Sequence, residues 1–216
     1  MQPVRSGMCL FALEGQPRRM SSAFRSLVVA LVVAVLAALV AYFAWPWIKN
    51  AMYVAELFAE EPPRTLPVPV KGVSMRAVRD TFGAPRPGDR THQGVDIFAP
   101  RGTPVLSTTR GIVARIGENS LGGTVVWVLG PGGDRHYYAH LNSIADIKTG
   151  QRVAPGHILG TVGTSGNARG TPPHLHYGVY RRAEGAINPF PLLTRQLAVD
   201  KVPARKTGSV TDRSAE

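Results

Sequence analysis

An apolar run near the amino terminus constrains the fold more than any other feature of the chain. Residues 27–48 read LVVALVVAVLAALVAYFAWPWI and contain no charged side chain. A helix needs about 20 apolar residues to cross the hydrocarbon core of a bilayer, so this run is long enough. Tyr42, Trp45 and Trp47 lie at its far end, where amphipathic rings favour the headgroup layer. The sequence therefore predicts a transmembrane helix over residues 27–48.

The charges on either side of this run predict its orientation. Arg18, Arg19 and Arg25 precede it, whereas Lys49 is soon followed by acidic residues. Basic residues beside a membrane helix stay in the cytoplasm, so residues 1–26 should lie inside the cell and the following domain outside. A cleavable signal peptide is the alternative, and it needs small residues one and three positions before the cut. Each nearby alanine that could stand directly before the cut has a tyrosine at the third position before the cut, where a small residue is needed. The sequence therefore favours a retained anchor in the inner membrane.

The composition changes after the apolar run. Residues 49–73 are expected to form a Pro-rich linker, in which the prolines of residues 62–69 make a short, stiff and extended spacer. Residues 74–195 carry the patterns of a folded domain, in which Ser74 could cap a short helix that ends near Thr81. Residues 196–216 are polar without a periodic apolar pattern, so we expect a disordered tail.

Short strands dominate the pattern from Gly83 onward. The candidate strands are TPVLSTTRGIVARIG, TVVWVLG, DRHYYAHL, HILGTVG and HLHYGVY. They are rich in β-branched and aromatic residues and are bounded by Gly or Pro, which is typical of strands joined by tight turns. We therefore predict a mainly β fold class, with an antiparallel β-sheet or sandwich domain preceded by the single transmembrane helix.

The charge and the cysteine content limit the classes of partner. The formal net charge of +11 favours an anionic partner such as acidic lipid, nucleic acid or a cell-wall polymer, although basic tails on a solvated surface also explain it. The chain contains no dense basic run interleaved with aromatic residues, so nucleic acid is not expected as a partner. The single cysteine, Cys9, excludes an internal disulfide.

The histidines are the most informative candidates for chemistry. They are His92, His136, His140, His157, His174 and His176. His92 and Asp96 stand four residues apart in HQGVD, and HLH on a strand would point His174 and His176 to the same face. Histidine and carboxylate are natural zinc ligands, and catalytic zinc keeps three protein ligands with one open position. Spacing alone does not choose the three ligands, and two histidines with one carboxylate also suit ferrous iron.

The residues around these histidines resemble the LytM or lysostaphin-like zinc peptidases of family M23, which cut peptide cross-links in bacterial cell walls. The resemblance runs from about Phe82 to Tyr180 and consists of the ordered blocks HQGVDI, APRGTPV, GIV, YAHL, GQRVAPGHILGTVGTSG and PHLHYGV. One departure is LGGT at residues 121–124, where the family often has an aromatic–glycine–asparagine element.

The resemblance implies a role for each of five residues. His92, Asp96 and His176 would bind Zn²⁺. His140 and His174 would be catalytic, acting on the attacking water, the oxyanion or the leaving amine. All five positions hold the residue type that the family uses, as in its active members.

Other residues have weaker predicted roles. Tyr138 and Asn167 are candidates for substrate binding, although core packing and turn formation explain them as well. His136 would share a strand face with Tyr138 and His140, and we expect it to be a partly exposed residue. Trp127, within VVWVLG, is expected in the core.

Together, these features predict a membrane-anchored zinc endopeptidase that hydrolyses peptide cross-links of peptidoglycan with a metal-activated water. Its partners would be peptidoglycan peptides and the membrane, and the sequence identifies no regulatory protein. One alternative is a non-catalytic LytM-like module that binds the wall or activates another hydrolase, and the complete ligand set argues against it. The other is a biotinyl- or lipoyl-like carrier domain, which requires a modifiable lysine, and residues 72–147 contain none.

Overall fold

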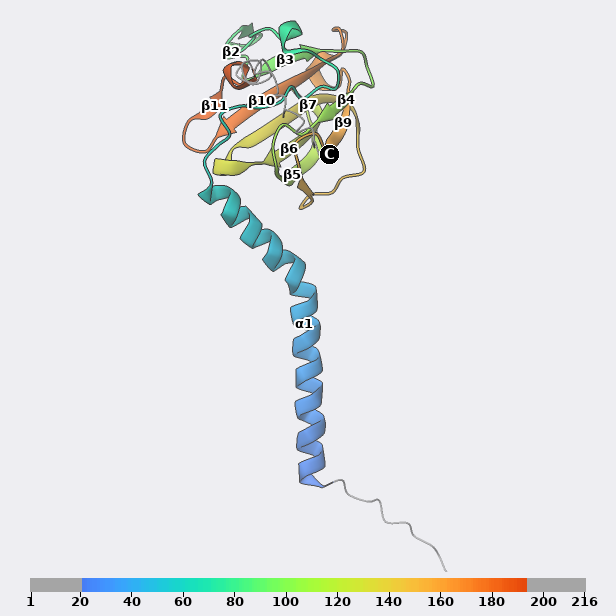
Figure 1. Cartoon of the computed structure of the whole chain (residues 1–216). Helices are drawn as coiled ribbons and strands as arrows, with labels where there is room; N and C mark the ends of the chain where they lie inside the picture. The colour runs from blue at the N-terminus through green and yellow to red at the C-terminus, as the bar shows by residue number, and fades with distance from the viewer. Residues whose placement is uncertain (1–20, 194–216) are drawn as a thin grey trace, which may run out of the picture. The chain divides into compact units, whose positions relative to one another are not determined.

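The structure, a computed structural model, describes residues 21–193 (Figure 1). The predicted tail of residues 196–216 and most of the predicted cytoplasmic segment lie outside these residues. The described chain divides between Ile48 and Lys49 into two compact units.

The apolar run lies in one long helix, α1 (Ser22–Ala59). By length and composition this helix is able to cross a membrane, as the sequence predicts for residues 27–48. Residues 49–59, predicted as part of the linker, belong to this helix. The prolines that were expected to extend the chain begin only at Pro62, so nothing in residues 49–59 interrupts the helix.

The last turns of α1 belong to the second unit, where they pack on the β domain. Leu57 is fully buried. The Arg152 guanidinium lies 4.3 Å from the centre of the Tyr53 ring, within the range of a cation–π contact. Arg110 forms ion pairs with Glu56, at 3.2 Å, and with Glu60. The end of the helix is therefore part of the domain rather than a free spacer.

The domain is built from antiparallel strands, as predicted. They are β1 (Pro85–Arg86), β2 (Arg90–Thr91), β3 (Val95–Phe98), β4 (Pro104–Leu106), β5 (Gly111–Asn119), β6 (Gly123–Leu129), β7 (Arg135–Ile144), β8 (Arg152–Val153), β9 (Ile158–Val162), β10 (His174–Arg181) and β11 (Gly185–Ile187). β1 and β2 form a separate hairpin. The other nine strands form one sheet with the order β11-β10-β7-β6-β5-β8, in which β3 pairs with β10 and β9 pairs with both β4 and β7.

The described residues also contain three short 3-10 helices: η1 (Met75–Ala77), η2 (Pro131–Gly133) and η3 (Gly166–Ala168). η1 takes the place of the longer helix predicted after Ser74. The Ser74 hydroxyl does accept a hydrogen bond from the Arg76 amide, so the cap forms as expected. The backbone then becomes extended at Val78, which ends the helix after three residues.

The two faces of the large sheet are covered differently. Alternate residues of β6, Val126 and Val128, lie in the main core with side chains from most other strands. Val125 and Trp127, which alternate with them, point the other way, where Val125 packs with Tyr137 and Ala139 in a smaller cluster. Trp127, Tyr137 and Tyr180 line a groove on this second face, and four of the six histidines line the same groove.

Candidate metal centre

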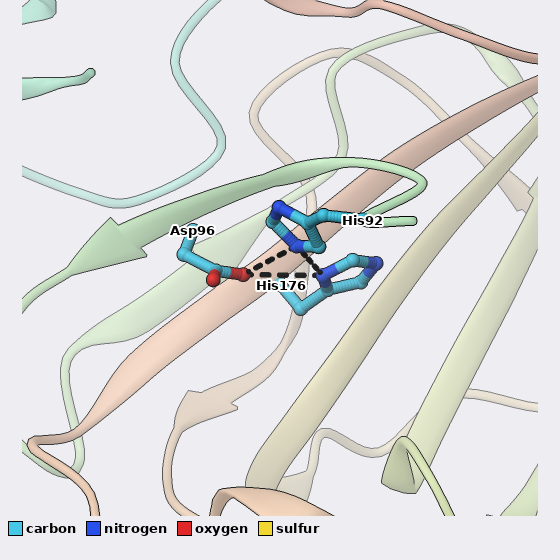
Figure 2. Close-up of side chains that lie close together, drawn as sticks. All are labelled: His92, Asp96 and His176. Atoms are coloured by element: carbon cyan, nitrogen blue, oxygen red, sulfur yellow. Dashed lines mark hydrogen bonds and ion pairs between the residues drawn. The ribbon is translucent and has the colours of Figure 1, made fainter. Parts of the chain in front are cut away.

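The register of β3 and β10 brings two of the predicted ligands together. Asp96 on β3 is the direct cross-strand partner of His176 on β10. His92 precedes β3 by a short turn, and its ring folds back over the same point (Figure 2). Among the described residues, these three form a group whose ligand atoms all lie close enough to bind one metal ion.

The three ligand atoms are spaced as a metal requires. His92 Nε2 lies 2.8 Å from His176 Nδ1 and 3.0 Å from Asp96 Oδ1, and the last two atoms lie 3.1 Å apart. Zinc bonds of about 2.0 Å in a tetrahedron separate the ligand atoms by about 3.3 Å. The three ligand atoms would therefore have to move only slightly further apart to bind a tetrahedral ion.

Thr81 holds two of these ligands in place. The Thr81 carbonyl lies 2.6 Å from His92 Nδ1, and because a carbonyl only accepts, Nδ1 carries the proton. His92 Nε2 therefore has a lone pair for the metal. The Thr81 hydroxyl accepts a hydrogen bond of 3.0 Å from the Asp96 amide. Such outer contacts fix the orientation of metal ligands.

The protonation states of the ligands also suit a cation. Although burial raises the pKa of Asp96, its contacts with His176 and His92 outweigh burial and hold that pKa well below its usual range. Burial lowers the pKa of His176. At neutral pH the site thus offers the Asp96 carboxylate and, at His176, a neutral imidazole, which are forms that bind zinc.

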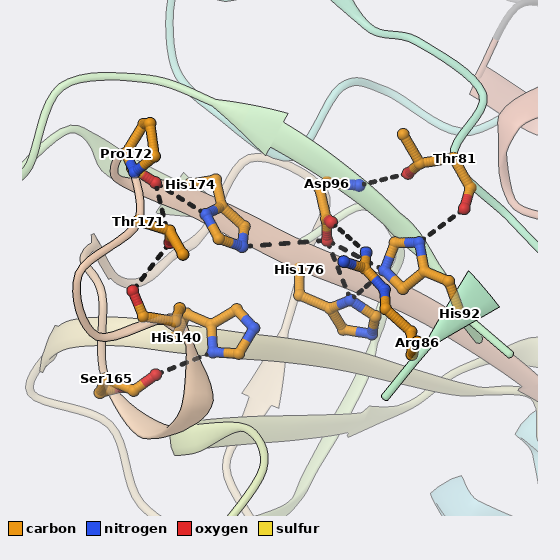
Figure 3. Close-up of polar contacts among 11 residues, drawn as sticks. Thr81, Arg86, His92, Asp96, His140, Ser165, Thr171, Pro172, His174 and His176 are labelled. Carbon is orange, nitrogen blue, oxygen red and sulfur yellow. Dashed lines mark hydrogen bonds and ion pairs between the residues drawn. The ribbon is translucent and has the colours of Figure 1, made fainter. Parts of the chain in front are cut away.

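The two predicted catalytic histidines lie beside this triad (Figure 3). His174 Nδ1 donates to the Pro172 carbonyl and His140 Nδ1 donates to the Ser165 carbonyl, each at 2.9 Å. In the neutral form of either ring, Nε2 therefore keeps a lone pair. The ring centres of His140 and His174 are 5.0 Å apart, and that of His140 is 5.9 Å from His176. Burial lowers the pKa of His140 to about 4, so it is neutral at pH 7.

His140 reaches the groove because its backbone is unusual. Its φ is +63°, in the left-handed region that few residues other than glycine adopt. Its amide donates to the Gly122 carbonyl at 2.7 Å, and the β6–β7 register shifts nearby. The strand alternation is broken at this residue. Contrary to the prediction, His140 therefore does not share a face with His136 and Tyr138.

Two of the predictions on β7 are wrong for this reason. Tyr138 is fully buried, and its hydroxyl accepts a hydrogen bond from the Thr108 amide, so it does not reach a substrate. His136, expected to be partly exposed, is 1 % exposed in the same polar cluster. The cluster consists of Thr108, His136, Tyr138 and Tyr177.

The metal centre opens into a groove of about 940 Å³. Asn167, predicted to bind substrate, lies in the groove wall. Trp127, predicted in the core, is half-buried and lines the groove floor. Its ring centre lies 4.3 Å from that of Tyr137 and 5.3 Å from that of Tyr180. Strand alternation within VVWVL, with Val126 and Val128 in the core, is the signal that could have placed Trp127 on this face.

Tyr137 also packs against the LGGT segment. A Cβ at Gly122 would collide with the Tyr137 hydroxyl. Asn119 braces this contact, because its side chain donates to that hydroxyl at 3.2 Å and accepts from the Gly122 amide at 2.6 Å. The aromatic group of this groove wall thus comes from β7, and glycine at position 122 leaves room for it.

The comparisons with known proteins agree with this geometry. The sequence model described as Peptidase family M23 matches residues 90–189. The L-Ala–D-Glu endopeptidase of Bacillus subtilis is 43 % identical over 138 residues, which cover 59 % of this chain and 42 % of the relative. The peptidoglycan DD-endopeptidase ShyC of Vibrio cholerae is 38 % identical over 88 residues, which cover 41 % of this chain and 20 % of the relative.

A solved structure extends the comparison to the fold. A Pseudomonas aeruginosa crystal structure assigned to peptidase M23 superimposes with a TM-score of 0.50 at 30 % identity. The match covers 67 % of this chain and 59 % of that structure. The chain spans less than half of the length of the two curated relatives.

Proposed function

The chain belongs to peptidase family M23, and from this premise we propose that it is a zinc endopeptidase that cuts the peptide part of bacterial peptidoglycan. The observation that carries the proposal is the convergence of five side chains. Three ligand atoms lie within 3.1 Å of one another, and two imidazoles beside them each donate their Nδ1 proton to a backbone carbonyl. This arrangement suits hydrolysis of an amide by an activated water.

His92, Asp96 and His176 would hold the ion. Bound Zn²⁺ supplies a Lewis acid for the scissile carbonyl and lowers the pKa of a bound water to about 7. His140 and His174 would accept and donate protons during the reaction. Because the Nδ1 atom of each is committed to a carbonyl, its Nε2 can accept a proton from the attacking water. The same atom can then donate to the oxyanion or to the leaving amine.

The substrate is proposed from the relatives and from the groove. Both curated relatives are endopeptidases whose names refer to peptidoglycan or to a bond between L- and D-amino acids. Because the Bacillus subtilis relative is 43 % identical over 138 residues, the L-Ala–D-Glu bond is the first to examine. The aromatic floor of Trp127, Tyr137 and Tyr180 would bind apolar parts of the substrate on one side of the metal.

We also propose that α1 anchors the chain in the inner membrane, with the amino terminus in the cytoplasm and the catalytic domain outside. The apolar length of the helix and the arginines that precede it support this placement. A signal peptide would lead to the same compartment but would be cut from the mature protein, so the mass of the purified protein distinguishes the two.

Metal analysis tests the centre directly. The full chain in detergent should hold about one zinc per molecule, and His92→Ala and Asp96→Ala should abolish that binding. His157→Ala is the matched control, because this exposed histidine lies outside the groove. Full metal occupancy in either ligand variant would reject the assignment.

Hydrolysis tests the reaction. Isolated peptidoglycan should release peptide fragments that mass spectrometry identifies, and a chelator should stop the release. His140→Ala should keep its zinc yet release no fragments. If the zinc-loaded wild-type chain released nothing but still bound wall material, the chain would be a non-catalytic wall-binding module.

A further inference from the structure

The two carboxylate oxygens of Asp96 have different partners. Oδ1 faces the two histidine nitrogens, at 3.0 Å from His92 and 3.1 Å from His176. Oδ2 instead accepts a hydrogen bond of 2.5 Å from Nη2 of Arg86 (Figure 3). A hydrogen bond between a guanidinium and a carboxylate is charge-assisted and is therefore stronger than one between neutral groups. The sequence patterns did not single out Arg86, and it is absent from the catalytic roles proposed above.

The partner of Oδ2 matters because a carboxylate can bind a cation through one oxygen or through both. If both oxygens of Asp96 bound the zinc, the protein would supply four donor atoms. The position that catalytic zinc keeps open for water would then be crowded. A guanidinium on Oδ2 leaves only Oδ1 available to the ion.

We propose that Arg86 is a positioning residue that reserves Oδ2 and so keeps Asp96 a one-oxygen ligand. It acts through Asp96 rather than on the substrate. The inference rests on the zinc site of the proposed function, and it adds a reason why this site keeps an open position.

The hairpin that carries Arg86 is fixed to the metal centre by its backbone. The Gly83 amide donates to the His92 carbonyl at 2.8 Å, and the His92 amide donates to the Ala84 carbonyl at 2.9 Å. β1 thus runs beside the ligand His92, and Arg86 follows two residues after Ala84. Pro85 restricts the backbone immediately before Arg86. The guanidinium is therefore delivered to Asp96 by a segment that is already tied to the site.

Arg90 provides a matched control on the same hairpin. It is the cross-strand partner of Arg86 and lines the same groove. Its Nε donates instead to the Pro87 carbonyl at 3.1 Å, within the turn of the hairpin. Replacing Arg90 removes the same charge from the same hairpin but leaves the contact with Oδ2 intact.

Cobalt substitution tests the proposal without measuring activity. Co²⁺ replaces Zn²⁺ in such sites, and its visible absorption bands are several-fold stronger with four ligands than with five. The full chain in detergent, loaded with Co²⁺, should show the strong four-ligand spectrum. Arg86→Ala should show weakened and shifted bands, because Oδ2 becomes free to bind, and Arg90→Ala should retain the wild-type spectrum.

The outcomes separate this inference from the proposed function. An Arg86→Ala spectrum identical to that of the wild type would overturn the role of Arg86 and leave the metal site standing. A wild-type chain that binds no Co²⁺ or Zn²⁺ would overturn the metal site itself. If Arg86→Ala lost the near-ultraviolet circular dichroism of the folded domain, Arg86→Met would replace it. Methionine keeps an apolar stem without the donors, and the same spectra would decide.

Discussion

Replacing His136 with asparagine should make the stability of the β domain less dependent on pH between 7.5 and 5. The wild-type side chain is 1 % exposed, and its Nδ1 lies 2.8 Å from the Tyr177 hydroxyl and 3.2 Å from that of Thr108. Its Nε2 has no hydrogen-bond partner among residues 21–193. Burial therefore lowers the pKa of His136 from 6.5 to about 3.

The size of the effect follows from that shift. A histidine whose pKa is lower in the folded state stabilises the fold while it is neutral. As the pH falls below 6.5 the unfolded chain takes up the proton first, so the free energy of unfolding decreases until about pH 3. The decrease is about 1.4 kcal/mol per pH unit. Between pH 7.5 and 5, His136 alone should remove about 2 kcal/mol.

Urea unfolding of the chelator-treated chain, followed by near-ultraviolet circular dichroism at pH 7.5, 6 and 5, measures this loss. The wild type should lose about 2 kcal/mol more than His136→Asn over this range. His140 and His176 also titrate at lowered pKa values, but they are present in both proteins and cancel in the difference. His157→Asn, at an exposed position, should behave as the wild type. Equal losses in the wild type and His136→Asn would refute the reasoning.

Three further substitutions test other parts of the domain. Thr81→Val removes the acceptor of the Asp96 amide and should weaken zinc binding about 10- to 100-fold in competition with a chelator, whereas Thr81→Ser should not. Trp127→Ala should raise the KM for peptidoglycan fragments several-fold with a smaller effect on kcat, and Trp127→Phe should recover most of the loss. Leu57→Ala should lower the free energy of unfolding by about 2–5 kcal/mol, because this fully buried side chain joins the end of α1 to the domain.

For each of these three predictions, one outcome would contradict the structural reasoning. Unchanged zinc affinity in Thr81→Val would remove the outer support assigned to that hydroxyl. An unchanged KM in Trp127→Ala would mean that the substrate does not contact the aromatic floor. Wild-type stability in Leu57→Ala would show that the end of the helix is not part of the folded domain in solution.

The metal ligands show how much of the site can be predicted from the sequence alone. The pairs His92 and Asp96, and His174 and His176, are local patterns, so their spacing could be read directly. The choice of His176 rather than His174 came from the resemblance to family M23. In the structure this choice corresponds to the register of β3 and β10, which sets His176 opposite Asp96 across 80 residues of sequence. No local pattern carries that pairing.

β7 shows where the local rules fail. A regular strand would place His136, Tyr138 and His140 on one face, yet only His140 lies in the groove. The left-handed backbone of His140 reverses the alternation, and the hydrogen bond from its amide to Gly122 accompanies that conformation. Because Gly122 comes from the loop before β6, the reversal depends on a contact between segments.

The sequence by itself determined the apolar helix, the antiparallel β class and the set of residues able to bind and use a metal. These properties depend on composition and on the period of neighbouring side chains, which are local. Only the tertiary structure decided that Trp127 lies in the groove, that Tyr138 does not, and that Arg86 meets Oδ2 of Asp96. Exposure and contact depend on which other segments cover a residue, and that information belongs to the packed chain as a whole.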